Sequence, residues 1–249
     1  MRRISIVLHR DFRELRQTNA FLIISILFAA VTVAASVIII IVLRRQELLE
    51  KETARPILEL IIGLIAYFLP LFVLMVFIWA FAFLTIIQEK VKGNIESLLA
   101  TPLSPKEIWI GKSIAIFLPG YIISIISTLI ILLAVNFFVI IPATGNFILP
   151  APLLLVSFLI NPLLFLALLL FIVLFSLANN PDIAIAPSFL VGFGLMMGIP
   201  LGVATGVINL ASWSFMLWCL AGAIIFWAAD FGFYRLLTKE NIVLSSKGD

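Results

Sequence analysis

The chain has few of the residues that enzyme chemistry needs. Its 249 residues include one cysteine and one histidine, and only 12% are charged, about half the share of an ordinary soluble domain. Cys219 alone cannot form an intrachain disulfide, and its place in an apolar run indicates packing. There is no HExxH motif and no paired aspartate within the apolar runs to build a metal or acid–base site. We therefore expect no enzyme activity, no metal and no directly bound cofactor.

Apolar sequence dominates what remains. Hydrophobic residues make up 63% of the chain. A helix needs about 20 such residues to cross a bilayer, and lipid cannot satisfy the backbone of an open strand. The predicted fold is all-α, one membrane domain over 1–249, with six transmembrane helices at 21–43, 57–87, 113–141, 153–178, 184–210 and 215–234.

Lysine and arginine indicate the orientation, because short cytoplasmic loops retain them. Five lie in 1–20, four in 88–112 and three in 235–249, against four in 44–56. Both termini and the 88–112 segment are therefore predicted to be cytoplasmic in a multi-pass protein of the cell membrane. The net charge of +3 follows from this orientation and does not indicate a nucleic-acid partner.

The stretch before the first apolar run, 1–20, is amphipathic at helical spacing. One arc carries the apolar residues Ile4, Leu8, Phe12 and Leu15, and the opposite side carries Arg2, Arg3, Arg10 and Arg13. Such a helix is expected to lie among lipid headgroups, where basic residues are attracted to anionic lipid. The alternative is a basic tail that only sets orientation.

The fifth apolar run contains glycine at every fourth position. Its members are Gly194, Gly198, Gly202 and Gly206, with Pro200 among them. Small residues let another helix approach closely, and Pro200 removes a backbone donor. Two interpretations stay open: packing within the chain, or a subunit seam or wall of a translocation path formed by these five residues.

One polar segment, residues 88–112, separates the second and third runs and reads QEKVKGNIESLLATPLSPKEIWIGK. Asn94 is placed to cap a short helix that Pro102 would end. Ser104 and Glu107, with proline between them, have the spacing of a capping box that begins a helix leading into the third run. Two short helices that are continuous with two spans would transmit a force from the cytoplasm to these spans. The alternative is a well-capped loop without a partner.

This segment resembles the hallmark of permease subunits of ABC-2-type ATP-binding-cassette transporters. That hallmark joins Gly-Thr-Leu-Glu, a Leu-Leu pair, Thr-Pro-Leu-Ser and a Gly-Lys before the next span, and Asn94-Ile95 departs from it. The matching positions are Glu89, Gly93, Glu96, Leu98, Leu99, Pro102, Leu103, Ser104 and Gly111. By resemblance they form the region that docks a separate ATPase, with Lys90, Lys92, Lys106 and Glu107 as charged contacts.

The resemblance implies the fold of a type V exporter. Its parts are an N-terminal elbow helix at the membrane interface, a coupling helix between spans two and three, and re-entrant turns before the last span. It also implies a dimer with a second permease copy or a paralogue. The expected partners are membrane lipids and two copies of an ATPase subunit, which would bind ATP and Mg.

Other classes of protein fit the sequence less well. Residues 111–113 (Gly-Lys-Ser) imitate the end of a phosphate loop, but Lys106 stands where its first glycine must be. An ion-coupled secondary transporter would place ionisable groups at mid-membrane depth, whereas Glu59 and Asp230 lie near the ends of apolar runs. A membrane scaffold would stimulate no ATPase.

The topology can be tested with a single cysteine at Ser97 in a Cys219→Ser background. Because the 88–112 segment is predicted to be cytoplasmic, this cysteine should resist membrane-impermeant maleimides in intact cells and react after the cells are opened. Labelling of intact cells would contradict the orientation.

Overall fold

The computed structural model describes residues 2–45, 54–82, 101–178 and 181–238, together with Glu240 and Ile242. The described residues form helices, turns and loops and contain no strand, which confirms the predicted all-α fold. The main helices are α1 (Arg2–Gln17), α2 (Asn19–Arg45), α3 (Ala54–Ala82), α6 (Pro105–Val135), α9 (Asn161–Ala178), α10 (Pro181–Ala204) and α11 (Trp213–Phe233). The short ones are η3 (Asn136–Ile140), α7 (Ile141–Thr144), α8 (Ala151–Leu155), η4 (Val156–Ile160) and η5 (Tyr234–Leu236).

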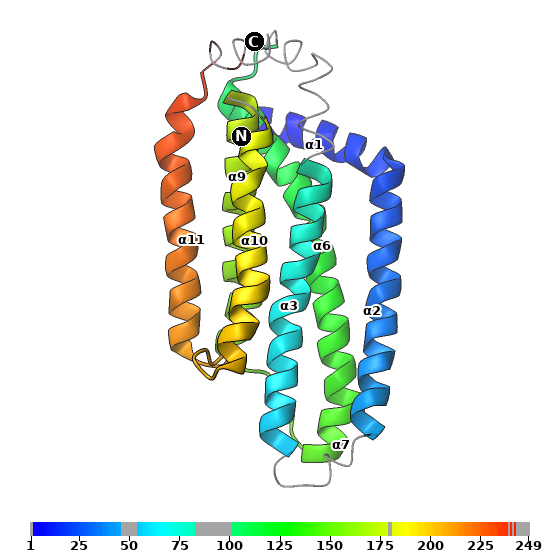
Figure 1. Ribbon diagram of the computed structural model, residues 1–249. Coiled ribbons are helices and arrows are strands. Elements are labelled where there is room, and N and C mark those ends of the chain that lie inside the picture. The colour runs from blue at the N-terminus through cyan, green and yellow to red at the C-terminus, as the bar shows by residue number, and fades with distance from the viewer. Residues whose placement is uncertain are drawn as a thin grey trace.

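Six stretches of the described residues are long and apolar enough to cross a membrane, as predicted. They are Asn19–Arg44, Pro56–Ala82, Pro105–Thr144, Ala151–Leu177, Ala186–Ala204 and Trp213–Phe233. The spans run side by side, and α1 lies across one end of them (Figure 1). We call this the α1 end. The start of α6 and the end of α11 lie at the same end (Figure 1).

The spans differ in how much of their surface is covered. α3 and α9 are the most enclosed, whereas α2, α10 and α11 leave most of their apolar residues exposed. α3 lies directly against α6, where the Ser124 hydroxyl donates to the carbonyl oxygen of Pro70 at 3.2 Å. In a bilayer the exposed apolar faces would be covered by lipid or by other subunits.

The turn after the third span is shorter than the gap between the predicted spans 113–141 and 153–178. Helix continues through η3 and α7 to Thr144 and resumes at Ala151. Gly145, with φ of 71°, ends the helix in the left-handed conformation. The buried Asn136 amide fixes the turn, since its oxygen accepts from the Ile148 amide at 3.0 Å.

The fifth span ends earlier than predicted, at Ala204 instead of residue 210. Gly206 adopts a φ of 74°, which glycine accommodates easily, and the Ile208 amide turns back to the Gly202 carbonyl at 2.9 Å. Ser212 then begins α11 by accepting the Phe215 amide at 3.2 Å. Gly206 therefore lies beyond the helix, so its predicted place on a four-glycine helical face is wrong.

The contact between α3 and α6 depends on Gly120. A Cβ atom there would lie 2.8 Å from Cβ of Phe77. Because Cβ of Phe77 is bonded directly to the backbone, it cannot move away unless α3 itself shifts. Gly120→Ala should therefore lower the free energy of unfolding in detergent by about 1–3 kcal/mol. Gly222→Ala on α11 is the matched control, because nothing lies within 4 Å of its Cβ position. Equal stability of the two variants in thermal unfolding would contradict this contact.

Candidate functional site

The first turn of α6 is fixed by its own side chains. The Glu107 amide donates to the Ser104 hydroxyl at 3.3 Å, and the Ser104 amide donates to the Glu107 carboxylate at 2.8 Å. Pro105 occupies a position at the helix start where no amide donor is needed. The predicted capping box is confirmed, and helix begins eight residues before the apolar run at 113. The 88–103 segment is therefore followed directly by a helix whose first turn is fixed by its own side chains.

One turn further on, α6 lies directly under α1. A Cβ atom at Gly111 would come within 2.8 Å of Val7 Cγ1 and 2.9 Å of Val7 Cβ. Val7 and Leu15 are buried on the same side of α1, toward the bundle. Glycine at 111 is therefore required by the close approach of the two helices.

A buried ion pair lies beside this contact. The Lys112 ammonium is 3.3 Å from an Asp11 carboxylate oxygen, and only 4% and 9% of the two side chains are exposed. Each charge has lost most of its contact with water, so the opposite charge of its partner contributes to its compensation. Asp11 thus holds α1 in one register on α6.

The same two turns of α6 contact the other half of the bundle. The Trp109 indole donates to the Leu170 carbonyl of α9 at 2.7 Å. The Lys106 ammonium lies 4.4 Å from the ring centre of Tyr234, just after α11, an arrangement typical of a cation–π contact. The start of α6 is therefore joined to α1, to α9 and to the end of α11.

The structure describes part of the predicted ATPase-coupling set. Pro102, Ser104 and Lys106 are exposed, Leu103 and Glu107 are half-buried, and Gly111 is buried. The other predicted positions lie outside the described residues: Glu89, Lys90, Lys92, Gly93, Glu96, Leu98 and Leu99. Among the six described positions, Ser104 and Glu107 form the helix cap and Gly111 contacts α1.

Asp11 was not among the predicted site residues. A signal for it exists in the sequence, because an acidic residue on the apolar arc of a basic amphipathic helix needs a buried partner. The partner, Lys112, is the lysine of the Gly-Lys pair before the third span. Their contact joins segments far apart in the chain, so sequence spacing gave no indication of it.

The glycine stripe is not a packing face within the described chain. Cβ atoms at Gly194 and Gly198 would have nothing within 4 Å, and one at Gly202 would meet Ile208 of the following turn. No described helix uses Gly194 or Gly198 for close approach, so that interpretation is wrong for these two. A seam with another subunit, or the wall of a translocation path, remains a prediction for Gly194, Gly198, Pro200, Gly202 and Gly206.

Residues 111–113 do not form a phosphate loop. All three are buried inside α6, and the Ser113 hydroxyl donates to the Trp109 carbonyl at 2.9 Å. A phosphate loop needs backbone amides free to cradle phosphate oxygens, whereas these amides lie within a continuous helix.

These features define a helical, multi-pass membrane protein in which the third span is tied to a helix lying across the bundle end. A family model described as ABC-2 family transporter protein matches residues 5–216. The chain therefore belongs to the ABC-2 family of transporter proteins, as the resemblance of the 88–112 segment predicted. No curated protein and no solved structure matches it.

The ion pair can be tested with Asp11→Asn, Lys112→Met and the double variant. Each single change removes one member of the pair and weakens the compensation of a charge that stays buried, so it should lower the free energy of unfolding by about 3–5 kcal/mol. The double variant should lose less than the sum of the two single losses. Unfolding in mixed detergent micelles measures all three.

The control is Glu14→Gln, which breaks the exposed ion pair between Arg10 and Glu14 on the same helix. Exposed pairs contribute little, so its loss should stay below about 1 kcal/mol. Additive losses for the Asp11 and Lys112 variants, or losses as small as the control's, would show that the buried pair does not join the helices.

Proposed function

We propose that the chain is the membrane subunit of an ATP-driven exporter. It pairs with a second permease, either another copy or a paralogue, and docks two copies of a separate ATP-binding-cassette subunit through the 88–112 segment. ATP and Mg bind to that partner subunit. Membership of the ABC-2 family supports this proposal, because permeases of this family generally work with such an ATPase.

The observation that carries the proposal is the set of contacts at the start of α6. The helix begins at a capping box directly after the 88–103 stretch and touches three other elements within its first two turns. A force on the segment before Ser104 would therefore reach α1 through Gly111 and Asp11, and α9 through Trp109. A loop without a partner would not need this bracing.

The α1 end faces the cytoplasm in this proposal. The excess of lysine and arginine in 1–20, 88–112 and 235–249 supports that orientation. The ATPase then sits next to the start of α6, and cargo leaves at the opposite end.

The exposed apolar faces of the spans support a dimer. α10 and α11 leave most of their apolar residues uncovered, and Gly194 and Gly198 present open backbone on α10. Because Gly194 and Gly198 have no side chains, a second permease could approach this face closely. The translocation path would run along the seam, beside Gly194, Gly198 and Pro200. Its apolar walls suit amphipathic or lipid-like cargo.

An ion-coupled carrier is the second candidate, and one observation favours it. Asp230 is 2% exposed, and neither of its carboxylate oxygens has a hydrogen-bond partner among the described residues. It lies one turn before the end of α11 at Phe233, however, whereas a relay requires ionisable groups near mid-membrane. The ATP-driven exporter is therefore the better-supported function.

The docking role can be tested by reversing one charge on the 88–112 segment. Glu96→Lys would place a like charge against its contact on the ATPase, an arrangement that costs several kcal/mol. Permease-stimulated ATP hydrolysis in the reconstituted complex should fall by about tenfold or more.

Glu14→Lys is the control, because it makes the same charge reversal at an exposed glutamate of α1, outside the 88–112 segment. Thermal unfolding of the permease alone should be the same for both variants. Unchanged hydrolysis in Glu96→Lys would refute docking through this position. Uphill transport by the purified chain without any ATPase would refute the proposed function as a whole.

A further inference from the structure

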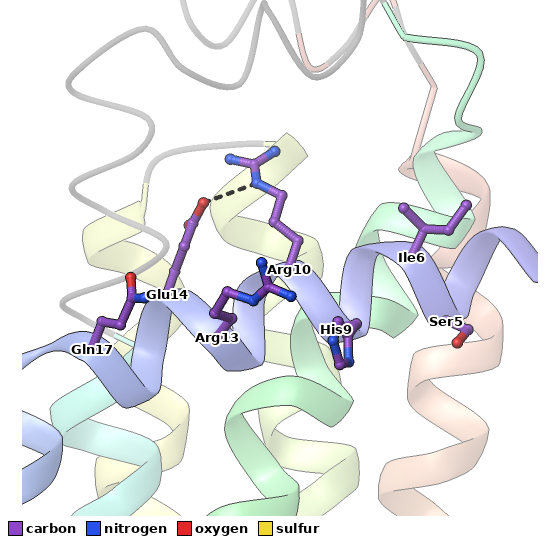
Figure 2. A pocket seen from close by; sticks show the side chains of 7 residues that line it. All are labelled: Ser5, Ile6, His9, Arg10, Arg13, Glu14 and Gln17. Atoms are coloured by element: carbon purple, nitrogen blue, oxygen red, sulfur yellow. Dashed lines mark hydrogen bonds and ion pairs between the residues drawn. The ribbon is translucent and has the colours of Figure 1, made fainter.

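The outward side of α1 carries a polar strip beside a shallow hollow. Ser5, His9, Arg13 and Gln17 follow one another at intervals of four residues, which places them in one row on the helix. They line an open hollow of about 610 Å³ together with Ile6, Arg10 and Glu14 (Figure 2). All four residues of the strip are exposed.

The strip lies next to the apolar side of the helix. The apolar row consists of Ile4, Leu8 and Phe12, which are half-buried. The residue directly after each of them, Ser5, His9 or Arg13, belongs to the strip. At 100° per residue the two rows are neighbours around the helix. If the half-buried row meets the edge of the hydrocarbon, the strip lies at the level of the lipid headgroups.

The two arginines near the hollow differ in their surroundings. Arg10 donates to the Glu14 carboxylate at 2.9 Å, and Figure 2 shows both side chains extending from α1 away from the spans. Arg13 lies on the other flank of the hollow, in the strip. No acidic side chain of the described residues forms an ion pair with it. The positive charge of Arg13 is thus available to a ligand.

We propose that the strip binds the phosphate of an anionic phospholipid in the leaflet at the α1 end. Arg13 supplies the charge, and Ser5, His9 and Gln17 supply hydrogen-bond donors to phosphate oxygens. A lipid is the occupant, because the strip adjoins the apolar row of α1 and the Arg10–Glu14 pair faces away from the spans. The site would anchor α1, and through Asp11 and Lys112 it would hold the start of α6.

This inference does not depend on the ATPase partnership. Its test uses the full chain, reconstituted in vesicles of equal phosphatidylcholine and phosphatidylglycerol and then released for native mass spectrometry. The measured quantity is the ratio of phosphatidylglycerol to phosphatidylcholine bound to the protein. Arg13→Gln should lower this ratio by about fivefold, the effect of one basic residue at an anionic membrane surface.

Arg10→Gln removes the same charge from the same helix and is the matched control. It should leave the ratio at the wild-type value, because Arg10 is engaged with Glu14 on the other flank. Equal losses in both variants would mean that only the total charge of α1 matters, and no loss in Arg13→Gln would mean that the strip binds no lipid. Either result overturns the proposal.

Two further measurements separate other ligands from a lipid. Inorganic phosphate added to the lipid-free protein in detergent should not raise its unfolding temperature, and a rise that depends on Arg13 would indicate a soluble phosphate site instead. If Arg13→Gln keeps its phosphatidylglycerol but no longer retains an ATPase during purification, the strip is a protein-docking surface. That result would also overturn the proposal.

Discussion

The buried ion pair between Asp11 and Lys112 fixes how the first helix meets the rest of the molecule. Two charges withdrawn from water are compensated only by each other and by close neighbours, so neither helix can slide without exposing an uncompensated charge. The absence of a side chain at Gly111 allows this close approach, because Val7 fills the space where a Cβ atom would lie. The position of α1 across the bundle end follows from these contacts.

The start of α6 therefore does more than begin a membrane span, because it also holds neighbouring helices in place. Its cap is closed by Ser104 and Glu107, Gly111 and Lys112 hold α1, and Trp109 bonds to the backbone of α9. A helix start anchored to several elements moves as one unit with them. In a transporter driven from outside its own chain, such a unit is the natural receiver of force, which is why the proposed ATPase contact belongs immediately before it.

The opposite end of the bundle is held in a different way. There the contacts satisfy backbone groups: Arg44 donates to the Phe138 carbonyl at 2.9 Å and Asn136 bonds across the turn to Ile148. Unpaired carbonyls are costly near hydrocarbon, and Phe138 lies in the π-helical segment η3. Between the two ends, the spans α10 and α11 leave much of their apolar surface uncovered.

The sequence by itself determined the helical membrane fold, the six spans and the cap at Ser104, because these depend on apolar run length and on residues a few positions apart. It also carried the family resemblance in the 88–112 segment. Tertiary structure decided that Asp11 meets Lys112, that Gly111 receives Val7, and that Gly194 and Gly198 face open space. Such contacts join distant segments, and composition or periodicity carries no information about which distant residues meet.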